Sequence, residues 1–132
     1  MIMLPNLYFR IRENGAAVFR LDAANRDRRL ELDQIAVVNT NRGDFKAQGD
    51  HQLSPEEVTA IEDWTEKRMT QLADRTLDDI HRAIDHLNLT AQWAQTKASD
   101  EALEAVTDQL LLAMHDLRSV LVRKKADRLD QQ

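Results

Sequence analysis

Apolar and polar residues alternate over residues 7–12 and again over residues 16–22. A period of two is typical of β-strands that bury one face. Asn14-Gly15 lies between the two runs and supplies two residues that tolerate positive φ, as the central positions of a type I′ turn require. The pattern predicts an antiparallel hairpin with strands near residues 6–12 and 16–22.

A third apolar run, from Leu30 to Val37, changes phase in its middle. The change predicts a β-bulge near Asp33 and Gln34 that returns the apolar side chains to one face. Turn-forming residues 39–44 follow, and a short fourth strand is expected at 45–48. Residues 1–53 are therefore predicted to form a four-stranded antiparallel meander.

The period changes to that of a helix at residue 54. Ser54, Pro55 and Glu57 form the start signal of a helix with a capping box, and this helix is expected to end near Ala73. Thr76, followed by two aspartates, predicts a second helix start. A third start is predicted at Ser99-Asp100-Glu101, with the last helix running to about Leu129. The sequence therefore predicts three helices after the sheet.

Two apolar seams run along the second and third predicted helices in alternating steps of three and four, which keeps each seam on one side of its helix. Such seams predict that the last two helices form a long antiparallel hairpin. The positions are Leu77, Ile80, Ile84, Leu87, Ala91, Ala94 and Ala98 in one helix, and Leu103, Val106, Leu110, Ala113, Leu117 and Val120 in the other.

Each hairpin helix also carries large apolar residues away from its seam: Leu89 and Trp93 on one, Leu111 and Val122 on the other. Leaving such a side chain in water forgoes roughly 1.5–3 kcal/mol, so a cover is expected. The cover is either the chain's own sheet and first helix or another chain, including a second copy that would make a homodimer. These four residues are the candidate partner-binding set.

Together these elements predict an α+β fold in a single domain, residues 1–132, with a β-meander over 1–53 and a helical part over 54–132. The 132 residues include no cysteine, and no apolar stretch approaches the ~20 residues of a membrane span. Residues 1–12 do not resemble a secretory signal. We therefore expect a cytoplasmic protein without contact to a membrane.

Candidate chemistry is sparse. Asp78, His81 and Asp85 lie on one helical stripe with a carboxylate-x-x-His spacing found in di-metal helical bundles, but no second such pair accompanies them. There is no nucleophile elbow, P-loop or dinucleotide fingerprint. The expectation is no catalytic residue, no metal and no cofactor, and a metal-dependent helical enzyme is the least favoured alternative.

The net charge of -5 disfavours broad nucleic-acid binding, although residues 1–53, with eight basic and seven acidic side chains, carry +1. A nucleic-acid surface would use Arg10, Arg12 and Arg20 on the polar face of the first hairpin, with Tyr8 for stacking. Acidic residues interleave with these arginines and could pair with them. Arg26, Arg28 and Arg29 in the following loop would belong to the same surface.

The sequence therefore favours a non-catalytic interaction or regulatory protein that acts through protein–protein contacts. A nucleic-acid-binding accessory protein is the alternative.

Overall fold

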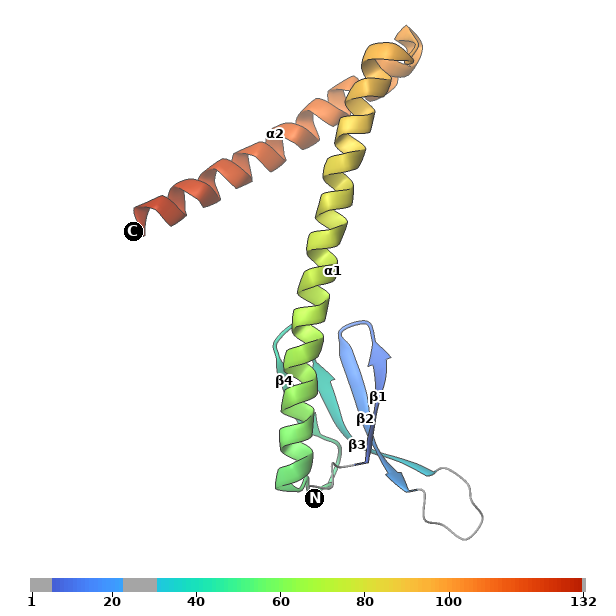
Figure 1. Ribbon diagram of the computed structural model, residues 1–132, viewed down its shortest axis with the longest axis vertical. Coiled ribbons are helices and arrows are strands. Elements are labelled where there is room, and N and C mark those ends of the chain that lie inside the picture. The colour runs from blue at the N-terminus through green and yellow to red at the C-terminus, as the bar shows by residue number, and fades with distance from the viewer. Residues whose placement is uncertain (1–5, 23–30, 132) are drawn as a thin grey trace. The chain divides into compact units, whose positions relative to one another are not determined.

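A computed structural model describes residues 6–22 and 31–131 of the chain (Figure 1). It contains the predicted antiparallel sheet followed by helices: β1 (Leu7–Arg12), β2 (Gly15–Asp22), β3 (Glu31–Asn39), β4 (Asp44–Ala47), α1 (Pro55–Thr96) and α2 (Asp100–Asp130). The chain divides into two compact units, Met1–Ile80 and His81–Gln132. The division therefore falls within the residues of α1.

The four strands pair in the order β1-β2-β3-β4, all antiparallel, which confirms the predicted meander. The first turn differs from the prediction. Arg12 pairs with Gly15, so the two loop residues are Glu13 and Asn14. Gly15 does not have a positive φ; instead, a Cβ at this position would overlap the carbonyl oxygen of Val38 on β3. The glycine is required here by the close approach of the neighbouring strand.

The predicted bulge is present in β3, but it does not bring the apolar run to one face, because Leu32 and Val37 are 40% and 41% exposed on the side opposite the core. Val18 pairs with Ala36 and Phe19 pairs with Gln34, which leaves Ile35 as the extra residue of the bulged strand. The Ile35 side chain is fully buried. The bulge thus allows two consecutive residues, Ile35 and Ala36, to enter the same core.

The core of the first unit lies between one face of the sheet and the N-terminal part of α1, which runs along that face in Figure 1. Phe9 of β1 stacks on Trp64 of α1 with the ring centroids 4.5 Å apart and the planes almost parallel. The buried residues of this core are Ala16, Val18, Ile35, Ala36, Val38 and Ile61.

The capping box predicted at the start of α1 is confirmed. The backbone N–H of Glu57 donates to Ser54 Oγ at 3.1 Å, and the backbone N–H of Ser54 donates to Glu57 Oε1 at 2.9 Å. Two backbone donors that lack an intrahelical partner are thereby satisfied.

The predicted helix boundary between Ala73 and Thr76 is wrong, because α1 is one continuous helix of 42 residues and the described residues form two helices, not three. Thr76 does not cap a helix; its hydroxyl donates to the carbonyl of Leu72, four residues earlier, at 3.0 Å. This bond allows threonine to sit inside a helix. No proline or glycine follows Pro55 before Ser99, so nothing forces the helix to stop.

The predicted start of the last helix is confirmed at Ser99, whose hydroxyl accepts from the backbone N–H of Ala102 at 3.1 Å. Within His81–Gln132, the two seams do not pack against each other along their length as predicted. Trp93, Ala98, Leu103 and Val106, close to the connection at residues 97–99, are half-buried. Farther from it the seams are open, and Leu117, for example, is 53% exposed.

Candidate interaction surfaces

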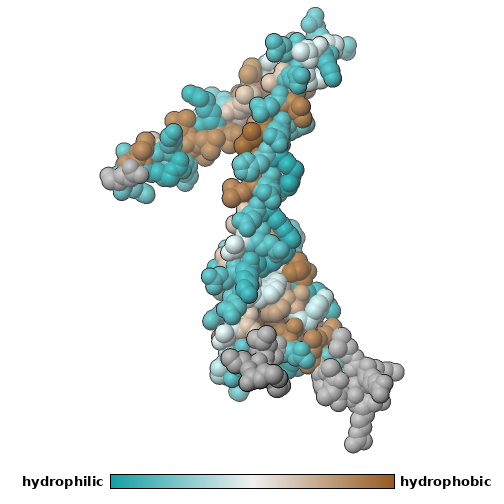
Figure 2. All heavy atoms as spheres, in the orientation of Figure 1, coloured by the Kyte–Doolittle hydropathy of each residue, from teal (hydrophilic) through white to brown (hydrophobic). Residues whose placement is uncertain are grey.

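The second unit exposes an unusual amount of apolar surface. No residue of α2 is buried, and Figure 2 shows hydrophobic side chains along much of this helix. We call the exposed large apolar residues of this unit the distal apolar surface: Ile84, Leu87, Leu89, Leu110, Leu111, Leu112, Met114, Leu117, Val120, Leu121, Val122 and Leu129.

Three of the four predicted partner-binding residues belong to the distal apolar surface. Leu89, Leu111 and Val122 are 61%, 59% and 56% exposed, whereas Trp93 is half-buried. Contiguous apolar patches larger than a few hundred Å² are uncommon on monomeric soluble proteins and mark interaction sites when they occur. The distal apolar surface is therefore the main candidate site.

A second surface is the face of the sheet opposite the core. A two-residue hairpin loop pairs odd-numbered with even-numbered residues, so Tyr8, Arg10 and Arg12 share a face with Phe19 and Ala17. Tyr8 is 44% exposed. The guanidinium carbon of Arg10 lies 4.5 Å from the centroid of the Phe19 ring and 5.9 Å from that of Tyr8. Arg10 is thus engaged in cation–π contacts that help to bury Phe19.

The structure corrects the prediction for Arg20, which does not share this face. Arg20 pairs with Leu7 and points toward α1, where Nε and Nη2 donate to the Glu57 carboxylate at 2.8 and 2.9 Å. The bonds to Arg20 hold the pKa of Glu57 below its ordinary value, although partial burial opposes the shift, and they raise the pKa of Arg20. The predicted cluster of three arginines is therefore reduced to two.

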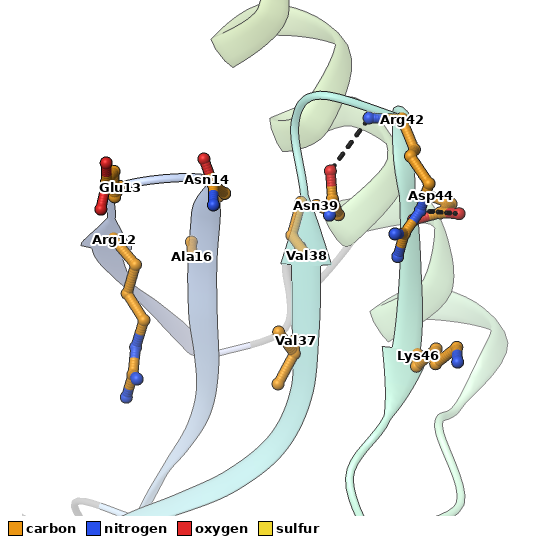
Figure 3. Close-up of a pocket in the computed structure, with 11 residues that line it drawn as sticks. Arg12, Glu13, Asn14, Ala16, Val37, Val38, Asn39, Arg42, Asp44 and Lys46 are labelled. Carbon is orange, nitrogen blue, oxygen red and sulfur yellow. Dashed lines mark hydrogen bonds and ion pairs between the residues drawn. The ribbon is translucent and has the colours of Figure 1, made fainter.

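A shallow pocket of about 320 Å³ opens at the turn end of the sheet (Figure 3). Gly15 lies in its lining, and the basic side chains Arg12, Arg42 and Lys46 come from β1, the turn at 40–43 and β4. Arg42 donates from Nε to the Asp44 carboxylate at 3.1 Å. Glu13 also lines the pocket, so its basic charge is largely balanced by acidic charge.

His51 forms a smaller polar cluster at the other end of β3. Its Nδ1 lies 2.6 Å from the carbonyl oxygen of Gln48 and its Nε2 lies 3.1 Å from the carboxylate of Asp33. The contact with Gln48 and then that with Asp33 raise the pKa of His51. The cluster links the segment before α1 to the bulged strand.

The remaining predicted residues do not form a site in the structure. Arg26, Arg28 and Arg29 lie outside the described residues. Asp78, His81 and Asp85 are exposed on α1, and the described part of the chain contains no group of three histidine or acidic side chains placed to hold a metal ion. Among the described residues, no helix is long and apolar enough to cross a membrane.

Sequence reasoning missed the pairing of Arg20 with Glu57. The signal that could have found it is the parity of the hairpin: any two-residue loop places Arg20 on the same face as Leu7 and Phe9, which are core residues. An arginine on the buried face of a sheet needs a carboxylate partner, and Glu57 lies in the first turn of the helix that covers this face.

The chain was also compared with known proteins. No protein-family model, no curated protein and no solved structure matches it.

Proposed function

We propose that this chain is a non-catalytic interaction or regulatory protein that acts through protein–protein contacts made by the distal apolar surface. The observation that carries the proposal is the exposure of Leu89, Leu111 and Val122, each more than half open to water. Covering such side chains releases roughly 25 cal/mol per Å² of apolar area, which is the main driving force of protein association. The lack of cysteine is compatible with the reducing cytoplasm, where we propose that the protein acts.

The proposal is tested with charged substitutions on α2. In a Leu111→Glu/Val122→Glu double variant we expect protein partners, whether other proteins or further copies, to bind at least tenfold more weakly. The matched control is Ser119→Glu, which adds a charge to an exposed position of the same helix. Circular dichroism checks that both variants keep their helices, and cross-linking with mass spectrometry in native extract measures binding. Equal capture by the wild type and the double variant would overturn the proposal.

The outer face of the sheet supports a second candidate, a nucleic-acid-binding accessory function. Tyr8 and Arg12 are exposed there, and Lys46 joins them from β4. This candidate predicts binding of single-stranded DNA or RNA at low salt that is lost in an Arg10→Ala/Arg12→Ala variant. Arg20 is left unchanged in this test because its guanidinium donates hydrogen bonds to the Glu57 carboxylate. No binding at low salt excludes the candidate.

A further inference from the structure

The apolar residues of α2 surround more of the helix than one neighbouring helix can cover. At 100° per residue, Leu110, Leu117 and Val120 belong to the seam, whereas Leu111 and Val122 lie about a third of a turn or more away from it. A helix packed on the seam would leave this outer stripe of Leu111 and Val122 open, with Met114 at its border with the seam. The stripe is exposed along its length in the described chain.

The charges of α2 are separated along the helix. Residues 100–116 hold five acidic and no lysine or arginine side chains, a charge of -5, whereas residues 117–130 hold five basic and two acidic ones, a charge of +3. Acidic residues near the N-terminus and basic residues near the C-terminus also suit the helix dipole, but that effect falls off within the first and last turns. Glu104, Asp108 and Arg118 lie beyond those turns, so the dipole does not account for the full separation.

We infer that α2 pairs with α2 of a second copy of this chain, antiparallel, about a two-fold axis near residue 115. This inference rests on the proposed function and names the partner. The axis lies at the middle of Asp100–Asp130 and places the acidic half of each helix against the basic half of the other. A parallel pair would place like charges side by side.

This arrangement also pairs one acidic with one basic residue on the outer side of α2, and it brings Leu111 opposite Arg118 of the second copy. Glu104 and Lys125 lie on the side of α2 that carries Leu111 and Val122, and an axis near residue 115 brings Glu104 opposite Lys125 of the second copy. Met114 lies close to the axis and packs near its own counterpart. A helix of 31 residues is roughly 46 Å long, and contact along it approaches the ~800 Å² per partner of a standard interface.

Disulfide cross-linking tests the orientation, because the chain has no cysteine of its own. Glu104→Cys and Lys125→Cys chains, one carrying a tag that changes its mass, are unfolded together, refolded as a mixture and oxidised. We expect a mixed disulfide dimer in the mixture and at least tenfold less dimer from either variant alone. Efficient dimers from each single variant would show a parallel pair and overturn the inference.

Charge reversal tests whether attraction between opposite charges holds the antiparallel pair together. Replacing Arg123, Lys124 and Lys125 by glutamate is expected to weaken the dimer at least tenfold in sedimentation equilibrium. A combined variant, in which Asp100, Glu101 and Glu104 are also replaced by lysine, is expected to form the dimer again. It should do so although its charges are the least favourable for the helix dipole. Failure of the combined variant to recover, with helix content retained, would overturn the inference.

A wild-type chain that sediments as a monomer at several hundred micromolar would also overturn the self-pairing. The proposed function would still stand in that case if the Leu111→Glu/Val122→Glu variant loses other proteins that the wild type captures. The proposed function fails if neither self-association nor the capture of other proteins is weakened in the Leu111→Glu/Val122→Glu variant.

Discussion

The guanidinium of Arg20 on β2 donates two hydrogen bonds to the carboxylate of Glu57 in the first turn of α1. The same carboxylate accepts from the backbone N–H of Ser54 and completes the capping box. One carboxylate therefore fixes both the start of α1 and the position of that start against the sheet. Glu57 is 8% exposed, so few of its hydrogen bonds could be replaced by water without local opening.

We predict that Arg20→Ala lowers the free energy of unfolding by about 1–2 kcal/mol, because it leaves the Glu57 carboxylate buried without its cation. Glu57→Ala should cost at least as much, and the double variant less than the sum of the two. Urea unfolding followed by Trp64 fluorescence in a Trp93→Phe background measures all three. Arg12→Ala, on the opposite face, is the control and should change stability by less than ~0.5 kcal/mol. Additive losses would contradict the coupling.

The lowered pKa of Glu57 predicts an acid-dependent loss of stability. A carboxylate with a depressed pKa in the folded state contributes stability above its unfolded pKa of about 4.3, and this contribution disappears as pH falls through the folded pKa. The stability difference between wild type and Glu57→Gln should therefore be full at pH 6 and shrink below pH 4. Unfolding curves recorded from pH 3 to pH 7 test this. A difference that stays constant over that range would contradict the prediction.

The contribution of His51 to stability is expected to change with pH in the opposite direction. Its raised pKa means that protonation favours the folded state, so its contribution is present below the unfolded pKa of about 6.5 and is lost as pH rises through the folded pKa. An NMR titration of the ring protons should give a pKa above 6.5. Asp33→Asn should lower it only in part, because the carbonyl of Gln48 is the larger cause. Complete return to the ordinary value would show that Gln48 plays no role.

Gly15 and Gly49 provide a matched pair of glycines required for different reasons. A Cβ on Gly15 would overlap the Val38 carbonyl, whereas Gly49 has φ +57° with open space around it. We predict that Gly15→Ala costs at least ~2 kcal/mol through displacement of β3, and that Gly49→Ala costs about 1–2 kcal/mol from backbone strain alone. Thermal unfolding measures which variant loses more stability. A larger loss in Gly49→Ala than in Gly15→Ala would contradict the prediction.

The strands were predictable because their alternation is a local signal that tertiary structure reinforces. The phase change between Leu32 and Ile35 located the bulge to within one residue, although the predicted result was wrong: Ile35 enters the core, whereas Leu32 and Val37 stay on the opposite face. The turn was assigned to the wrong pair of residues because glycine is favoured in two situations, a positive φ and the close approach of another strand. Asn14-Gly15 suggests positive φ, but Gly15 serves the close approach of β3, a contact between strands that no local pattern reports.

For the candidate interaction surfaces, the sequence predicted which residues are apolar but not what covers them. Periodicity identified Leu89, Leu111 and Val122 as apolar positions away from the seams, and they are exposed. It could not show that the seams themselves are open away from the connection, because a heptad pattern describes which side of a helix is apolar and not which partner covers it. Arg20 was misplaced for a related reason: its face depends on strand pairing, and its partner Glu57 lies 37 residues away.

The continuity of α1 yields a final prediction at Thr76. Because Thr76 lies inside the helix and bonds to the Leu72 carbonyl, Thr76→Ala should leave stability unchanged or raise it by up to ~0.5 kcal/mol through helix propensity. Ser99→Ala is the matched comparison and should cost about 1 kcal/mol, because Ser99 caps α2.

Amide hydrogen exchange provides the direct measurement for Thr76. In a continuous helix the backbone N–H groups of Leu77, Asp78 and Asp79 are bonded to carbonyls four residues earlier and exchange slowly. At a helix start the same groups would lack intrahelical partners and exchange quickly, as is expected for Asp100 and Glu101 after the cap at Ser99. Fast exchange at residues 77–79, together with a loss of ~1 kcal/mol in Thr76→Ala, would show that a helix begins at Thr76 after all.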